Sequence, residues 1–180
     1  MRIIAGSRKG ARIFAPKGLD TRPTGDRARE AAFNLAGPVD GARVLDLFAG
    51  SGAMGLEALS RGAASATFVE RDRDAAAAIE RNLDRLGLGG ATVLRDDAAR
   101  VLAADAAAAR RYDLVLIDPP YRLLAGLLPM LARYLPSIVS GDGLVLVESD
   151  ARDEPELPLP LRTSRRYGST RITVFEAPPR

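Results

Sequence analysis

Short apolar runs alternate with alanine-rich stretches of helical pattern over most of the chain, and this alternation limits the fold more than any other feature. Strands separated by helices pair in parallel, and the helices then cover both faces of the sheet. The chain is therefore predicted to be an α/β protein with a Rossmann-like sheet. The expected strands are 43–48, 66–70, 91–94, 113–117 and 143–148, and the expected helices are 52–61, 73–86, 97–109 and 122–135.

The alternation breaks after the fifth predicted strand. Residues 151–160 contain three prolines and are predicted as a loop, because proline interrupts helices. Beyond this loop, 162–167 and 170–175 flank Gly168-Ser169, a two-residue link that is typical of a β-hairpin. The sheet is thus expected to have seven strands, mostly parallel, and to end in an antiparallel hairpin.

The residues ahead of the first strand are expected to form a helix and an extension. The helix covers 27–35, with Thr24 or Asp26 as its N-cap and Gly37-Pro38 after its end. Residues 1–22, with isoleucines among glycines and basic residues, are predicted to form a small basic β-hairpin extension. Residues 23–180 are predicted to form a single globular domain.

Composition excludes several classes of protein. The 180 residues include no cysteine and no histidine, so disulfide frameworks, thiolate metal sites, zinc enzymes and hydrolases that depend on histidine are excluded. No apolar run approaches the roughly 18 residues that a membrane span requires, and the N-terminus lacks the apolar core of a secretory signal. We therefore expect a cytoplasmic protein, a monomer without membrane contact or bound metal.

Charge is distributed unevenly along the chain. The first 30 residues carry eight Lys and Arg against three Asp and Glu, the last 20 carry five against one, and the middle carries 13 against 19. Two basic ends around an acidic centre indicate that both termini contact a polyanion such as nucleic acid, or else carry solvated charge alone.

A glycine-rich turn joins the first predicted strand to the following helix. The strand 43–48 leads directly into Ala49-Gly50-Ser51-Gly52-Ala53-Met54-Gly55. Gly50 and Gly52 can adopt backbone angles that other residues avoid, and the N–H groups that begin a helix bind polar or anionic groups of a ligand. The turn predicts a nucleotide-like cofactor in contact with Ala49, Gly50, Ser51 and Gly52.

The turn taken alone fits two cofactors. Glu70 lies 20 residues after Gly50, so the chain also satisfies the dinucleotide fingerprint of NAD-dependent oxidoreductases. Three further acids favour S-adenosylmethionine, because Asp46 lies within the first strand, Asp97 follows the third and Asp118 follows the fourth. Ligands of open α/β sheets bind at these carboxyl ends of the strands.

Each acid has a predicted partner in S-adenosylmethionine. Glu70 is expected to accept hydrogen bonds from the ribose hydroxyls, Asp97 from the adenine amino group, and Asp46 to orient the methionyl ammonium. A capping role at the start of a helix fits Asp97 as well. Arg71 and Ala98, which follow two of these acids, complete the predicted cofactor contacts.

The motif Asp118-Pro119-Pro120-Tyr121 follows the fourth predicted strand. The exocyclic amine of a base is a poor nucleophile, because its lone pair is delocalised into the ring. The Asp118 carboxylate and the Pro119 carbonyl can accept its two N–H groups and so direct the lone pair at a methyl group, while Pro120 stiffens the loop. Tyr121 can stack on a base that is single-stranded or flipped out. These four residues predict an S-adenosylmethionine-dependent methyltransferase that acts on a base amine.

Four alternatives stay open on these residues, one of which, a non-catalytic RNA-binding module, explains the basic termini only. An adenine-N6 DNA methyltransferase shares the Asp-Pro-Pro-Tyr motif, and a protein glutamine methyltransferase prefers asparagine at position 118. An NAD-dependent oxidoreductase explains the glycines and Glu70 but neither the motif nor the basic termini.

The chain resembles the RsmD family of bacterial 16S rRNA guanine-N2 methyltransferases over nearly its whole length. The resemblance rests on residues 2–6 (Arg-Ile-Ile-Ala-Gly), 22–34 (Arg-Pro-Thr-Gly-Asp-Arg-Ala-Arg-Glu-Ala-Ala-Phe-Asn) and 47–63 around the glycine-rich turn. It implies a class I methyltransferase fold over 23–180, and transfer of one methyl group to N2 of a guanine in 16S rRNA of the small ribosomal subunit or its assembly intermediate.

The resemblance also implies roles for particular residues. Asp118 and Pro119 would hold the guanine amine, Tyr121 would face the base, and Gly50, Gly52, Glu70 and Asp97 would hold the cofactor. The residues predicted to contact RNA are Arg8, Lys9, Arg12, Arg22, Arg27, Arg165 and Arg166.

Overall fold

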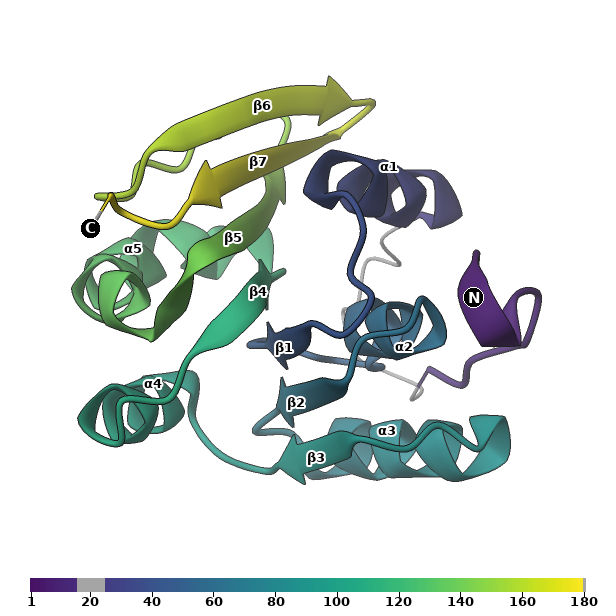
Figure 1. The fold of residues 1–180 in the computed structure, drawn as a ribbon. Coiled ribbons are helices and arrows are strands. Elements are labelled where there is room, and N and C mark those ends of the chain that lie inside the picture. The colour runs from purple at the N-terminus through teal and green to yellow at the C-terminus, as the bar shows by residue number, and fades with distance from the viewer. Residues whose placement is uncertain (16–24, 180) are drawn as a thin grey trace.

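A computed structural model describes residues 1–15 and 25–179. Seven strands form one sheet in the order β3-β2-β1-β4-β5-β7-β6 (Figure 1). Strands β1 to β5 pair in parallel, whereas β7 is antiparallel to both β5 and β6. The predicted α/β class and the mostly parallel seven-stranded sheet with a terminal hairpin are confirmed. The strands are β1 (Arg43–Asp46), β2 (Ser65–Val69), β3 (Ala91–Leu94), β4 (Tyr112–Ile117), β5 (Val139–Asp150), β6 (Leu161–Tyr167) and β7 (Thr170–Glu176).

Helices cover both faces of the sheet. The short 3-10 helix η1, α1, α2 and α3 lie on one face, and α4 and α5 lie on the other (Figure 1). Their bounds are η1 (Gly6–Arg8), α1 (Asp26–Ala36), α2 (Ala53–Ser60), α3 (Arg73–Leu86), α4 (Ala98–Ala107) and α5 (Tyr121–Ile138).

The apolar runs of the central strands supply two cores. Val44 and Leu114 pack on the side of α1, α2 and α3, while their neighbours Leu45 and Val115 pack on the side of α4 and α5. All four side chains are buried, as expected for strands of a parallel sheet that is covered on both faces. This burial is the reason why the strands read as continuous apolar runs.

Two elements are longer than the sequence pattern predicts. Strand β5 begins at Val139 rather than at residue 143, because Val139 already pairs with Tyr112 of β4. It continues to Asp150, because its second half pairs with β7 up to Thr170. Helix α5 extends to Ile138, which is fully buried together with Leu135.

The predicted N-terminal β-hairpin is not confirmed. Residues 1–13 do fold back on themselves, since the Ile3 amide donates to Ala11 O at 2.9 Å and the Ile13 amide to Met1 O at 3.1 Å. Within the described residues the pairing amounts to one isolated bridge, between Arg2 and Arg12. The tip is taken up by η1 rather than by a two-residue turn. Residues 16–22, the rest of the predicted extension, lie outside the described residues, and the division of the chain at residue 22 stays a prediction.

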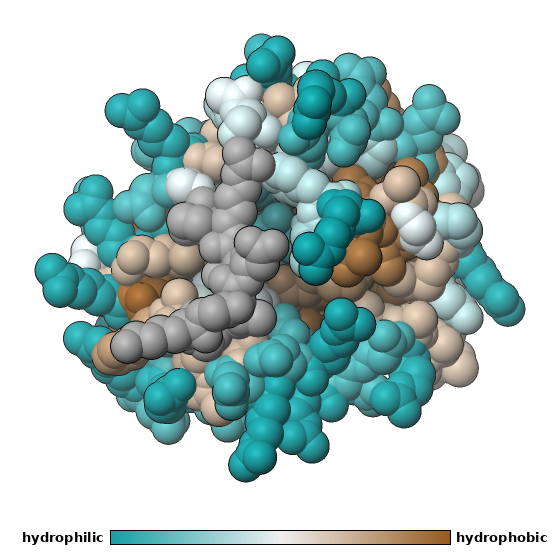
Figure 2. All heavy atoms as spheres, turned by 180° about the vertical axis from the view of Figure 1, so that it is seen from behind, coloured by the Kyte–Doolittle hydropathy of each residue, from teal (hydrophilic) through white to brown (hydrophobic). Residues whose placement is uncertain are grey.

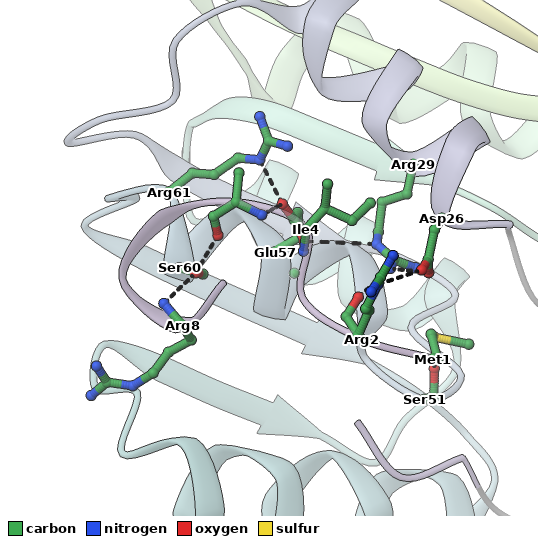
Figure 3. A network of polar contacts seen from close by, with 12 residues as sticks. Met1, Arg2, Ile4, Arg8, Asp26, Arg29, Ser51, Glu57, Ser60 and Arg61 are labelled. Carbon is green, nitrogen blue, oxygen red and sulfur yellow. Dashed lines mark hydrogen bonds and ion pairs between the residues drawn. The ribbon is translucent and has the colours of Figure 1, made fainter. Parts of the chain in front are cut away.

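A buried carboxylate attaches this N-terminal segment to α2. Glu57 is fully buried, and its two oxygens accept hydrogen bonds from the Ile4 and Ala5 amides at 2.8 and 3.0 Å. Figure 3 shows Glu57 between two arginines, Arg61 at 2.7 Å and Arg29 at 3.8 Å. A buried charge is tolerated when it is paired and hydrogen-bonded in this way. The segment is therefore part of the folded core rather than a separate arm.

The outer surface is largely hydrophilic. Figure 2, which views the molecule from behind Figure 1, shows hydrophilic side chains projecting around the rim and hydrophobic surface exposed between them. No helix of the described residues is long and apolar enough to cross a membrane.

Candidate active site

Four acids gather at one edge of the sheet. Asp46 ends β1, Glu70 follows β2, Asp97 follows β3 and Asp118 follows β4. Because these strands are parallel neighbours, their carboxyl ends lie at the same edge. The structure therefore brings together the acids that the sequence predicted as cofactor and acceptor contacts.

The glycine-rich turn is held in shape by Glu70. The Glu70 carboxylate accepts a hydrogen bond from the Gly50 amide at 2.8 Å and another from the Asp72 amide at 2.8 Å. Gly50 has a φ of 55° and Gly52 a φ of 79°, a left-handed conformation that favours glycine. Gly52 is the N-cap of α2 and has no side-chain capping bond. Helix α2 thus begins at a turn in which two of the four residues, Gly50 and Gly52, carry no side chain, as is common where a ligand approaches the start of a helix.

Asp46 lies beneath this turn. Its side chain is 1% exposed and accepts a hydrogen bond from the Gly55 amide at 2.9 Å. Burial raises the pKa of Asp46 to about 7; the Gly55 hydrogen bond opposes that rise, and the charges of Asp118 and Glu70 add to it. A carboxylate whose charge is disfavoured in this way is stabilised by a cation that binds beside it.

The predicted adenine contact also caps a helix. Asp97 is exposed and is the N-cap of α4, where its carboxylate accepts a hydrogen bond from the Ala99 amide at 2.9 Å. Ala98, the first residue of α4, is buried, whereas Arg71 is exposed beside Glu70. The capping role that the sequence left open for Asp97 is therefore present, and a second carboxylate oxygen stays available for a ligand. Ala49 and Ser51 are buried in the turn itself, and Ser51 Oγ lies 3.7 Å from Met1 Sδ.

The Asp118-Pro119-Pro120-Tyr121 loop joins β4 to α5. Asp118 is half-buried, Pro119 is buried, and Pro120 is the exposed N-cap of α5. Tyr121 begins the helix, and its hydroxyl lies 3.0 Å from Thr170 Oγ1 and 3.3 Å from Glu148 Oε1. The loop is thus short and stiffened by two prolines, and the Tyr121 hydroxyl connects it to strands β5 and β7.

The predicted RNA contacts divide into two groups. The Arg8 guanidinium donates to Leu86 O, and to Gly87 O at 3.2 Å, at the C-terminus of α3. Helix α3 starts at the edge of the sheet that holds the four acids (the site edge). Its C-terminus, with Arg8 and the neighbouring Lys9, therefore lies at the opposite edge of the sheet (the far edge). Arg8 satisfies helix carbonyls there and is not brought to the site.

The second group surrounds the site edge. Helix α1 runs into β1 at the far edge, so its first turn, with Arg27, lies at the site edge. Arg165 and Arg166 lie near the end of β6, which runs in the same direction as β5. Arg12 pairs with Arg2, whose guanidinium contacts Asp26 at 3.1 Å at the start of α1. Of these basic residues Arg12, Arg27, Arg165 and Arg166 are exposed; Arg22 lies outside the described residues.

Two groups of contacting residues were not predicted from the sequence. Glu148 and Thr170 contact Tyr121, and Glu148 follows the apolar run 144–147 of β5 just as Asp118 follows that of β4. The same strand-end signal could have identified Glu148. No local signal marks Glu57 and Arg29, which are buried because the N-terminal segment folds over them.

The sheet order separates the two cofactor classes. A dinucleotide-binding fold has six parallel strands in the order 3-2-1-4-5-6, whereas this sheet inserts β7 antiparallel between β5 and β6. Together with the acids and the Asp-Pro-Pro-Tyr loop, this order defines an enzyme, a class I methyltransferase whose donor is S-adenosylmethionine. The described residues fit that donor, because a glycine turn and several carboxylates, one of them buried, lie at the same edge and can complement its hydroxyl and amino groups and its positive charge. Among residues 1–15 and 25–179, no three Asp or Glu side chains group as a metal site would require.

Comparison with known proteins identifies the family. Residues 1–176 match the family described as Conserved hypothetical protein 95, and the chain belongs to it. A Bacillus subtilis relative, YlbH, is 40% identical over 98% of both chains. Ribosomal RNA small subunit methyltransferase D of Escherichia coli is 40% identical over 85% of this chain and 76% of its own. The solved structure of yhhF from Escherichia coli superposes with a TM-score of 0.81 at 35% identity, covering 100% of this chain and 99% of the other.

Proposed function

We propose that the chain transfers a methyl group from S-adenosylmethionine to N2 of a guanine in 16S rRNA of the small ribosomal subunit. The observation that carries this proposal is the Asp118-Pro119-Pro120-Tyr121 loop beside the glycine-rich turn. Membership of a family that includes a ribosomal RNA small subunit methyltransferase supports the choice of RNA. The proposal includes a cytoplasmic monomer that acts on the subunit or its assembly intermediate.

Orientation is the main work proposed for the loop. The Asp118 carboxylate and the Pro119 carbonyl each accept one N–H of the base amine, which turns the nitrogen lone pair toward the methyl group. Holding two reactants in such a geometry can contribute about 7–11 kcal/mol to a rate. S-adenosylmethionine supplies an electrophilic methyl group on a sulfonium when it is bound. After transfer the nitrogen loses a proton to Asp118 or to water, so no histidine is needed.

Three parts of the cofactor match three acids in this proposal. Glu70 accepts from the ribose hydroxyls in addition to the Gly50 and Asp72 amides, and Asp97 accepts from the adenine amino group. Asp46 faces the positive methionyl group, either directly or through water. Ala49, Gly50, Ser51, Gly52, Arg71 and Ala98 complete the proposed cofactor contacts.

The test of the proposed function is a methylation assay with product mapping. Labelled S-adenosylmethionine is incubated with small subunits that lack the modification, with free 16S rRNA and with duplex DNA, and the labelled nucleoside is identified after digestion. We expect N2-methylguanine at one position in the ribosomal substrate. Label on adenine N6 in DNA would overturn the proposal in favour of a DNA methyltransferase, and the two RNA arms decide between naked rRNA and the assembled subunit.

The RNA-binding surface is proposed to be the exposed arginines at the site edge, Arg12, Arg27, Arg165 and Arg166. Each phosphate contact releases counterions, so binding weakens with salt in proportion to the number of contacts. Replacement of Arg12 or Arg166 by alanine should reduce the slope of log affinity against log salt by about one per lost phosphate contact. Lys9→Ala, at the far edge, is the matched control and should leave the slope unchanged. If Arg12→Ala and Arg166→Ala both keep the slope of the natural chain, the site-edge arginines carry solvated charge only.

A further inference from the structure

The Tyr121 side chain is attached at both of its ends. Its backbone follows Pro119-Pro120 and begins α5, and its hydroxyl reaches across to two neighbouring strands. There the hydroxyl donates to Glu148 Oε1 on β5 at 3.3 Å and shares a second hydrogen bond with Thr170 Oγ1 on β7 at 3.0 Å, in which either oxygen can be the donor. The long axis of the ring is thus fixed between the Asp-Pro-Pro-Tyr loop and the end of the hairpin.

Both partners are held rigidly. Glu148 is 3% exposed and Thr170 is 8% exposed. Glu148 pairs with Ile172, and Thr170 pairs with Asp150, in the antiparallel ladder of β5 and β7. A carboxylate buried this deeply costs folding free energy unless it is hydrogen-bonded, so its position next to a tyrosine hydroxyl has a physical consequence for both groups.

The two partners also lie beside the proposed acceptor site. Ile117 of β4 pairs with Val147 of β5, so the residues that follow them, Asp118 after the end of β4 and Glu148 within β5, lie next to each other. Tyr121 lies three residues after Asp118 and bonds to Glu148. The hydroxyl contacts therefore couple the acceptor loop to β5 and β7.

We propose that Thr170 and Glu148 are positioning residues that fix the Tyr121 ring against the acceptor base. A tyrosine at the start of a helix could otherwise exchange between side-chain rotamers, and a rotamer change would move the ring away from a stacked base. Bonds to its hydroxyl restrict that exchange, so turnover depends on the hydroxyl as well as on the ring. This inference rests on the proposed function, because it assigns the ring to the base that is methylated.

The test combines single and double substitutions. Tyr121→Phe keeps the ring and removes both hydroxyl contacts, and Thr170→Val keeps the shape of the side chain and removes one of them. We expect kcat to fall about tenfold in Tyr121→Phe and less in Thr170→Val, since small misplacements of a reacting group are costly in rate. The double variant should match Tyr121→Phe alone, because Thr170 acts through a hydroxyl that is already gone. Glu148→Gln, which keeps an acceptor, should retain more activity than Glu148→Ala.

The control is Thr173→Val on the same strand. Thr173 is as buried as Thr170, but its hydroxyl lies 3.2 Å from Ser164 Oγ on the far strand of the hairpin. Thr173→Val should leave kcat unchanged, and the affinity for S-adenosylhomocysteine should be unchanged in all the threonine and tyrosine variants. Additive losses in the double variant, or equal losses in Thr170→Val and Thr173→Val, would overturn the positioning role.

A second measurement tests, without substrate, whether the hydroxyl contacts restrict the Tyr121 side chain. The χ1 coupling constants of Tyr121 in solution should report one rotamer in the natural chain and averaging in Thr170→Val. If Tyr121 has one rotamer in both proteins, the positioning role of Thr170 is overturned, even if methyl transfer is found. Failure of the proposed function has a different signature, because the natural chain would then transfer no methyl to the ribosomal substrate while the rotamer difference persists.

Discussion

The two ends of strands β1 and β4 hold their acids in opposite ways. At the far edge, Asp113 accepts two hydrogen bonds from the Arg43 guanidinium, each at 3.1 Å, and this bonding lowers the pKa of Asp113 to about 2. At the site edge, burial raises the pKa of Asp46 to about 7. The described residues offer Asp46 no ion-pair partner, only the Gly55 amide at 2.9 Å.

The difference supports a far edge that stabilises the fold and a site edge that is proposed to bind a ligand. A paired acid such as Asp113 stabilises the fold in its charged form. A buried acid such as Asp46 disfavours its own charge in the folded chain, and a bound cation would reverse that preference. S-adenosylmethionine carries positive charge at its sulfonium and its ammonium, so in the proposed site the bound cofactor would supply Asp46 with the kind of pairing that Arg43 provides at the far edge.

The largest effect is expected when an acid is removed from one end of β4 and compared with removal of the acid at its other end. Asp118→Ala should lower kcat by about 100- to 1000-fold, because one of the two acceptors for the base amine is lost. The affinity for S-adenosylhomocysteine, measured by calorimetry, should stay within a few-fold of the natural chain, since the proposal assigns Asp118 to the acceptor and not to the donor. Asp113→Asn, at the other end of the same strand, should keep its activity. Full activity of Asp118→Ala would remove Asp118 from the proposed mechanism.

Asp46→Asn should have the next largest effect, and its sign depends on pH. The pKa of Asp46 is higher in the folded chain than its ordinary value near 4, so the folded chain binds an extra proton between about pH 4 and pH 7. The free energy of unfolding therefore falls as pH rises through this window. Asparagine cannot ionise and can still accept the Gly55 hydrogen bond. At pH 8 the variant should thus be more stable than the natural chain, by about 2–4 kcal/mol.

The same substitution should weaken cofactor binding. Loss of the carboxylate removes the charge that complements the methionyl ammonium, so S-adenosylhomocysteine should bind more weakly to Asp46→Asn at pH 8. A gain in stability paired with a loss of affinity is typical of residues that serve a site rather than the fold. Urea unfolding at pH 5 and pH 8, with calorimetry at pH 8, measures both effects. A variant less stable than the natural chain at pH 8 would contradict the raised pKa.

The acids at the site edge could be predicted because their signal is local. Glu70 and Asp118 each follow an apolar strand run, and the carboxyl ends of parallel strands must meet at one edge. The glycine-rich turn is local as well, since Gly50 and Gly52 have the positive φ values that the sequence implied. Glu148 carries the same strand-end signal, but its contact with Tyr121 depends on the pairing of β5 with β7.

Contacts between distant parts of the chain could not be predicted in this way. Glu57 has the pattern of an ordinary helix charge, and it is buried because Ile4 and Ala5, more than 50 residues earlier, donate to it. Arg8 has the pattern of an RNA-binding arginine, yet its guanidinium contacts the end of α3 at Gly87. Charge patterning indicates that a side chain is polar but carries no information on which distant backbone group it meets.

The smallest effect is expected from Asp113→Asn. The Arg43 and Asp113 side chains are 51% and 36% exposed, and ion pairs with this exposure contribute about 0.2–1 kcal/mol. The variant should be less stable than the natural chain by that amount at pH 7. Because the pKa of Asp113 is lowered to about 2, its contribution is present above pH 4 and is lost as pH falls toward 2.

The stability curves of natural chain and Asp113→Asn should therefore converge on acidification between pH 4 and pH 2. The stability curves of the natural chain and Asp46→Asn should instead separate as pH rises from 4 to 7. The difference in the free energy of unfolding has the opposite sign there, because Asp46→Asn is more stable than the natural chain. Chemical unfolding of both variants across pH 2 to 8, at two salt concentrations, measures the two slopes together. Added salt should shrink the Asp113 difference, since exposed pairs are screened, and leave the buried Asp46 difference nearly unchanged. Slopes of the same sign would mean that the two ends of the sheet do not differ in the way their pKa values imply.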